Sequence, residues 1–121
     1  MPINDIRLKS RTEDGVLIIA PEGNILGGEG TQTLRTCIQE NLLAGTTRIV
    51  LDLAQVDFVN SMGLGVFLSM RAMVSRQKGI IVIAAPTVHV DDLFRMTQAN
   101  QIFPMYDAVE TAVKECKAWK P

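Results

Sequence analysis

Hydrophobic residues fall along the chain in short continuous runs separated by longer stretches with helical periodicity. The first segment, 6–11, alternates apolar and polar side chains, which is the period of a strand with one exposed face. Glu13-Asp14-Gly15 is typical of a tight turn, and the following run Val16–Ala20 is apolar throughout, as in a strand buried on both faces. The chain is therefore predicted to open with a hairpin whose polar strand lies at the sheet edge.

Helices and strands alternate through the rest of the chain. Apolar positions three or four residues apart predict helices over 31–44, 61–78, 91–99 (with Asn100 as a left-handed cap) and a last one capped by Asp107. Further strands are predicted over 49–53, 80–84 and 103–106. The order ββαβαβα(β)α implies parallel strands joined by crossover helices. We predict one α/β domain over 1–121, with its core at about 4–119, a mixed sheet of four to five strands and about four helices.

Composition and charge narrow the possible partners. Hydrophobic residues make up 47% of the chain, and the net charge of -1 comes from scattered acidic and basic residues with no basic stripe. This distribution argues against a nucleic-acid partner. The longest apolar run, 80–86, is far shorter than the roughly 20 residues of a membrane-spanning helix, and the first residues lack the features of a secretion signal. We expect a cytoplasmic protein without direct membrane insertion.

No set of catalytic or metal-ligating residues is apparent in the sequence. Cys37 and Cys116 lie far apart on apolar faces of predicted helices, where a thiol packs as a small hydrophobe. His89 is the single histidine, and a lone imidazole is typical of a surface residue. Asp52 and Asp57 follow a strand without an identifiable second acid, base or ligand, and Asp52 could equally bond the loop backbone. We expect no enzymatic activity, no cofactor and no metal.

A glycine-rich segment leaves one alternative of a different class open. Gly27-Gly28-Glu29-Gly30 lies between a strand and a helix N-terminus, where loops that cradle phosphates occur. The segment lacks the Lys-Ser/Thr of a P-loop and the spacing of a dinucleotide fingerprint. A small-molecule sensor or nucleotide-binding protein is therefore the alternative.

The junction between the third predicted strand and the second predicted helix is the most informative segment. Asn60 and Ser61 are both favourable helix caps, because their side-chain oxygens accept from free amides of the first turn. Gly63 and Gly65 each cost up to ~1 kcal/mol relative to Ala in a helix. Two glycines in one turn indicate a close approach to this backbone, either by a neighbouring strand or by a docked partner.

The second predicted helix has a clear apolar face and an ambiguous polar one. The core face consists of Val66, Phe67, Met70, Met73 and Val74. Leu64 and Leu68 fall instead among polar side chains. They could pack beneath an adjacent helix, or they could belong to an exposed apolar patch that binds a partner.

The chain resembles the STAS domain family, named for sulfate transporters and anti-sigma factor antagonists, from about Asn4 to Trp119. The resemblance rests on the order of elements and on a segment at the helix start that is similar to the family signature Asp-Ser-Ser/Thr-Gly-Leu. The residues that carry it are Gly23-Asn24, Leu51-Asp52-Leu53, Val56-Asp57-Phe58 and Asn60-Ser61-Met62-Gly63-Leu64-Gly65.

The resemblance implies partner switching. A stand-alone STAS protein binds an anti-sigma factor that is also a serine kinase, and phosphorylation of a signature hydroxyl breaks the complex until a PP2C-type phosphatase removes the phosphate. The resemblance places the acceptor just before the signature glycine, where this chain has Met62, which has no hydroxyl. Ser61 is the alternative acceptor. We therefore expect the docking role without the usual phosphorylation switch.

The resulting hypothesis is an anti-sigma factor antagonist or a related partner-switching regulator. Its expected contact surface comprises Gly23, Asn24, Asn60, Ser61, Met62, Gly63, Leu64 and Leu68. A second hypothesis, also implied by the resemblance, is a structural subunit of a larger assembly. Such a subunit would sit on the ATPase of a lipid-transport ABC transporter or within a stress-signalling scaffold.

Overall fold

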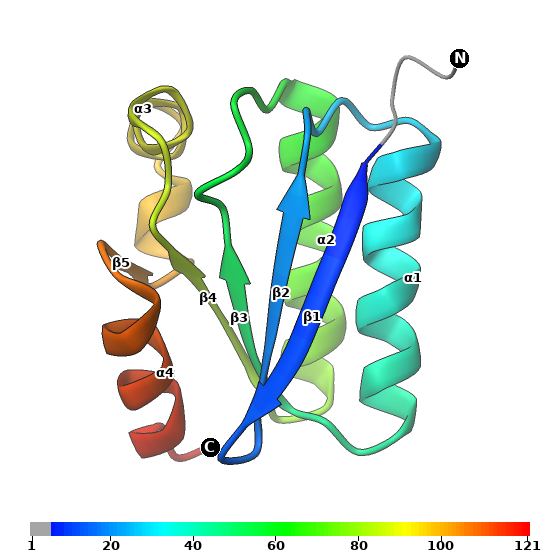
Figure 1. Cartoon of the computed structure of the whole chain (residues 1–121), viewed down its shortest axis with the longest axis vertical. Coiled ribbons are helices and arrows are strands. Elements are labelled where there is room, and N and C mark those ends of the chain that lie inside the picture. The colour runs from blue at the N-terminus through cyan, green and yellow to red at the C-terminus, as the bar shows by residue number, and fades with distance from the viewer. Residues whose placement is uncertain (1–5) are drawn as a thin grey trace.

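The computed structural model describes residues 6–121, so the expected domain start at Asn4 lies outside the described residues (Figure 1). The strands are β1 (Arg7–Glu13), β2 (Val16–Glu22), β3 (Arg48–Asp52), β4 (Ile80–Ala84) and β5 (Met105–Tyr106). The helices are α1 (Glu29–Leu43), α2 (Ser61–Arg76), α3 (Val88–Met96) and α4 (Val109–Ala118), with a 3-10 turn at Ala99–Gln101.

The five strands form one sheet in the order β1-β2-β3-β4-β5. β1 pairs with β2 in the antiparallel direction, and all other neighbours are parallel. The predicted α/β fold with a mixed sheet is confirmed, as is the position of the polar strand β1 at the edge. Leu8 of this strand packs against the core, and its other side chains are exposed.

Two hydrophobic cores explain why the central strands are apolar throughout. Leu17 and Ile19 of β2 pack on the side of α1 and α2, whereas Val16 and Ile18 pack on the side of α4. Successive residues of a strand point to opposite faces of the sheet, so a strand covered on both faces needs apolar residues at every position. Figure 1 shows α1 and α2 together behind the sheet and α4 in front of it.

The third helix differs from the prediction at both ends. α3 begins at Val88, three residues before the expected start, and the Asp91 amide already donates to the Thr87 carbonyl at 2.8 Å. The acidic pair that suggested a cap therefore lies inside the first turns, where the helix dipole also favours a carboxylate. The left-handed residue after the helix is Gln98, with φ 62°, and not Asn100.

The other helix ends differ by smaller amounts. α1 begins at Glu29, two residues before its expected start, and α2 ends at Arg76. α4 has Ala108 as its N-cap with no side-chain cap bond, so the prediction that Asp107 caps this helix is wrong. Within residues 6–121, no helix has both the length and the apolar character to cross a membrane.

Candidate functional site

The predicted site residues lie on the loop after β2 and on α2 with the loop before it, and these two loops are bonded to each other beyond the ends of β2 and β3. The Gly23 amide donates to the Gln55 carbonyl at 3.1 Å, and the Ile25 amide donates to the Phe58 carbonyl at 2.9 Å. The Asn60 amide donates back to the Ile25 carbonyl at 3.2 Å. Segments more than thirty residues apart in sequence are therefore joined by a short ladder of backbone bonds, which fixes the start of α2 relative to the loop after β2 (Figure 1).

Asn60 is the N-cap of α2 and also ties the two loops together. Its Oδ1 accepts from the Gly63 amide at 2.8 Å, and its Nδ2 donates to the Leu26 carbonyl at 3.2 Å. The expected cap at this junction is confirmed for Asn60, which leaves the side chain of Ser61 outside that role. A carboxylate at position 60 could still cap the helix, but it could not donate to Leu26.

Ser61 and Met62 are presented to solvent at the start of α2. Met62 is 68% exposed, and Ser61, the first residue of the helix, is also exposed. Met62 lies directly against the loop after β2, since a Cβ added to Gly27 would stand 2.6 Å from the Met62 Cβ. Gly27 has φ +87°, so both its backbone conformation and this contact favour glycine there.

The two glycines of the first turns have different surroundings. Gly63 is buried, and a Cβ at this position would overlap the Ile25 carbonyl oxygen. Close packing on a neighbouring segment is thus the confirmed interpretation for Gly63. Gly65 is exposed, and a Cβ there would meet nothing within 4 Å. Gly63 shapes the surface through its backbone, while no packing constraint explains Gly65.

Leu64 does not belong to the contact surface. Its side chain is 7% exposed and packs in the core with Leu34 and Phe67, so its inclusion in the contact surface is corrected. The reason is that α2 packs against both the sheet and α1, which widens its buried face beyond the part that faces the sheet. Leu68, one turn further along, remains 40% exposed. Asn24 is exposed and Gly23 is half-buried.

Two aspartates lie near the site, Asp52 at the end of β3 and Asp57 on the loop that follows. Asp52 Oδ1 accepts from the Ala54 amide at 3.1 Å, which confirms that this carboxylate fixes the path of the loop. Asp57 is exposed on the same loop. Among the residues that the structure describes, no group of three His, Cys, Asp or Glu side chains is placed to hold a metal ion.

An exposed aromatic pair lies next to the predicted site. The rings of Phe58 and His89 stack with their centroids 4.8 Å apart and their planes 25° from parallel. The Thr87 hydroxyl donates to the Val56 carbonyl at 3.0 Å, so the start of α3 is bonded to the same loop. The sequence predicts a surface position for His89 but does not pair it with Phe58. Phe58 beside the charged Asp57 in the loop was the available signal.

The glycine-rich segment before α1 has its own internal hydrogen bond. The Gly27 amide donates to the Thr31 hydroxyl at 2.9 Å, and Thr31 is fully buried. An amide that is already bonded to a side chain is not free to hold a phosphate. This bond and the contact with Met62 give Gly27 a structural role.

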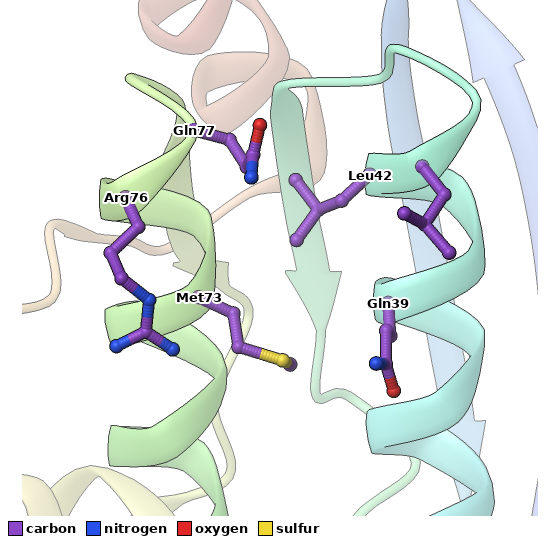
Figure 2. A pocket seen from close by; sticks show the side chains of 6 residues that line it. Gln39, Leu42, Met73, Arg76 and Gln77 are labelled. Atoms are coloured by element: carbon purple, nitrogen blue, oxygen red, sulfur yellow. The ribbon is translucent and has the colours of Figure 1, made fainter.

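A cavity of about 350 Å³ lies between the C-terminal ends of α1 and α2. Figure 2 shows Leu42 and Met73 pointing from the two helices into the gap, with Gln39, Arg76 and Gln77 around it. This cavity is at the opposite end of α2 from Asn60, Ser61 and Met62.

Both cysteines have properties of structural thiols. Burial raises the pKa of Cys116 to about 11, and burial followed by the charge of Glu40 raises the pKa of Cys37. Because the thiolate is the reactive form, a raised pKa makes a thiol less nucleophilic at neutral pH. Neither thiol has the lowered pKa of a catalytic cysteine.

The family is decided by comparison with known proteins. A family model described as STAS domain matches residues 7–112. The chain belongs to the STAS domain family. A Bordetella bronchiseptica protein that bears the name of anti-sigma factor antagonist BtrV is 28% identical to this chain over 108 residues. The matched residues cover 89% of this chain and 92% of BtrV.

Two solved structures have the same fold. The crystal structure of a protein assigned as an anti-sigma factor antagonist in Thermotoga maritima superposes with a TM-score of 0.84 at 22% identity, covering 91% of this chain and 94% of that one. The anti-sigma factor antagonist SpoIIAA in its unphosphorylated form superposes with a TM-score of 0.70 at 19% identity, covering 95% of this chain and all of SpoIIAA. At these identities the likeness establishes the fold.

Proposed function

We propose that this STAS protein is an anti-sigma factor antagonist that docks onto an anti-sigma factor through the start of α2 and the loop after β2. The docking surface consists of Gly23, Asn24, Asn60, Ser61, Met62 and Leu68. The protein works by binding in the cytoplasm and not by catalysis. Its relatives of nearly equal length that bear the name of anti-sigma factor antagonist support this proposal.

The observation that carries the proposal is the exposure of Met62. An apolar side chain that is 68% exposed at the first turn of a rigidly held helix is well placed to enter a pocket of a partner. The loops beneath it are fixed by backbone bonds and by the Asn60 side chain, so little conformational entropy is lost when the complex forms.

Ser61 is the residue at which we propose that phosphorylation controls docking. Met62 cannot accept a phosphate, and Asn60 is the helix cap, so the Ser61 hydroxyl is exposed and not engaged in capping. The sequence left the helix cap open between Asn60 and Ser61, and we expected no phosphorylation switch. Because Asn60 is the cap, we propose instead that Ser61 is phosphorylated. SpoIIAA, which has the same fold, is known in phosphorylated and unphosphorylated forms. A phosphate on Ser61 would bring nearly two negative charges into the docking surface.

The docking proposal is tested with the purified anti-sigma factor encoded in the same genome. We expect the wild-type protein to bind it and Met62→Asp to weaken binding at least tenfold, because a carboxylate would have to be desolvated at the interface. Leu43→Asp is the matched control, since Leu43 is 83% exposed at the far end of α1 and lies outside the docking surface. Equal affinity of wild type and Met62→Asp would refute this surface. Binding to an ABC-transporter ATPase instead would replace the proposed partner.

The phosphorylation proposal needs a separate measurement. The anti-sigma factor and ATP are incubated with wild type and with Ser61→Ala, and incorporated phosphate is located by mass spectrometry. We expect one phosphate on Ser61 of the wild type and none on the variant. If the anti-sigma factor binds the protein but leaves Ser61 unmodified, the phosphorylation proposal is refuted and docking without a switch remains.

A further inference from the structure

We propose that the docking surface continues from Met62 across the Phe58–His89 pair to Val88 at the start of α3, and that it selects an anti-sigma factor face with an apolar pocket and a basic rim. This inference rests on the proposed function and specifies the chemistry of the partner. It adds residues that belong to a different helix and that the sequence pattern did not place at the site.

Exposed apolar side chains gather at this end of the molecule. Met62 is 68% exposed, Val88 is 79% exposed and Phe58 is 41% exposed. A single exposed apolar residue is ordinary, but several that lie on adjoining loops are typical of a protein-binding surface. His89 stacks on one face of the Phe58 ring, so the start of α3 is in direct contact with the loop before α2.

Hydrogen bonds hold these residues on one platform. The Thr87 hydroxyl donates to the Val56 carbonyl, which attaches the residue just before Val88 to the loop that carries Phe58. The Phe58 carbonyl in turn accepts from the Ile25 amide in the loop beside Met62. Every neighbouring pair of loops at this end is therefore bonded directly, and the extended surface is pre-formed in the free protein. A pre-formed surface of this kind binds without a large ordering cost.

The exposed charges around the platform are mainly acidic. Glu29 at the start of α1, Asp57 beside Phe58 and Asp92 on α3 are all charged side chains at this end of the molecule. Of the basic side chains nearby, Arg95 binds Asp91 at 2.8 Å and Lys9 binds Glu22 at 2.9 Å, whereas Arg7, opposite Glu22 on β1, is exposed.

Basic side chains also lie at the opposite end of the molecule, away from the platform. Arg76 and Lys78 lie at and just beyond the end of α2, whereas Lys117 in the last turn of α4 is paired with Asp14 at 3.0 Å. An apolar centre with an acidic rim complements an apolar pocket surrounded by lysines and arginines. Complementary charge of this kind mainly raises the association rate.

The test uses the same purified anti-sigma factor and two kinds of variant. Val88→Lys removes an apolar contact and adds a charge of the wrong sign, and we expect at least a tenfold loss of affinity. The double variant Asp57→Lys/Asp92→Lys should slow association at least tenfold at low salt and reduce the effect of raising the salt concentration. Leu43→Lys is the control for charge and exposure at the far end, and it should leave both quantities unchanged.

The outcomes separate this inference from the proposed function. If Met62→Asp weakens binding while Val88→Lys and the double variant bind like wild type, the extension to α3 is overturned and the docking proposal stands. If Val88→Lys weakens binding but the double variant associates at the wild-type rate, the basic rim of the partner is overturned. If Met62→Asp also binds like wild type, the docking proposal itself fails. Circular dichroism of each variant verifies that it is folded.

Discussion

The carbonyl oxygen of Ile25 lies against the backbone of Gly63, in the place where a side chain on residue 63 would begin. The same carbonyl accepts from the Asn60 amide. The start of α2 is therefore set into the loop after β2 at a distance that only glycine permits, and this contact determines how far Ser61 and Met62 project into solvent.

Gly63→Ala is expected to destabilise the protein by about 1–3 kcal/mol, because the new methyl group must displace the Ile25 carbonyl from its hydrogen bond. Gly65→Ala provides the matched control. A Cβ at Gly65 would meet nothing within 4 Å and the residue is helical, so alanine should stabilise by up to ~1 kcal/mol. Urea unfolding of both variants measures the difference. Equal effects of the two substitutions would contradict the close contact.

Asn60→Ala is expected to lower the free energy of unfolding by about 1–2 kcal/mol through loss of the helix cap. Asn60→Asp should cost less, because a carboxylate still accepts from the Gly63 amide and only the bond to the Leu26 carbonyl is lost. Denaturant unfolding should therefore rank the proteins wild type, Asn60→Asp, Asn60→Ala in order of decreasing stability. A variant Asn60→Ala as stable as wild type would show that the cap contributes nothing.

Leu64→Ala is expected to destabilise the fold by about 2–5 kcal/mol, the range for removing a buried leucine. Leu68→Ala, at a 40% exposed position of the same helix, should cost under about 1 kcal/mol. The two variants should have the opposite order in binding, since only Leu68 belongs to the docking surface. Thermal unfolding and affinity for the anti-sigma factor are measured on the same preparations. If folded Leu64→Ala lost affinity while Leu68→Ala did not, the assignment of Leu68 to the docking surface and of Leu64 to the core would be overturned.

Arg48 holds the C-terminal end of α4 against the sheet. Its Nη1 donates to the Cys116 carbonyl at 2.7 Å, and its guanidinium lies 5.7 Å from the Trp119 ring centroid. Arg48→Ala is expected to cost about 1–3 kcal/mol, since a charged hydrogen bond to a helix end is lost. Arg76, at the end of α2, serves as the comparison, and Arg76→Ala should stay within about 0.5 kcal/mol of wild type in urea unfolding.

The pKa of Cys116 predicts the pH dependence of stability in alkali. An ordinary cysteine has a pKa of 9.0, and burial raises the pKa of Cys116 to about 11 in the folded protein. Between these two values the unfolded chain has lost a proton that the folded protein retains, so the contribution of Cys116 to the free energy of unfolding falls as the pH rises. Below pH 9 this contribution is fully present.

This expectation is measured by urea unfolding at about pH 8 and about pH 10, on either side of the ordinary thiol pKa, with Cys116→Ala as the control. The loss of stability over this interval should be larger in wild type than in the variant, which has no thiol to titrate at this position. The folded wild type should also resist alkylation of Cys116 by iodoacetamide at the lower pH. Rapid alkylation of that residue in the folded protein would contradict its burial.

The periodicity of apolar residues by itself determined the element order, the edge position of β1 and the two-sided burial of β2. These follow from local physics, because strands and helices repeat their side-chain directions every 2 and 3.6 residues. The pattern also placed Asn60 at the start of α2, and it left loop fixing as one of two roles for Asp52. It misplaced the start of α3, since Asp91 is as favourable inside the first turn of a helix as it is at the cap.

The tertiary structure alone decided which side chains at the junction are exposed. Leu64 is buried because α1 covers a part of α2 that periodicity assigns to the polar side, and Met62 is exposed because the Ile25 carbonyl fixes the depth of the helix start. The stacking of Phe58 on His89 joins residues from separate loops. Contacts of this kind depend on how distant segments are brought together, and no local repeat along the chain encodes that distance.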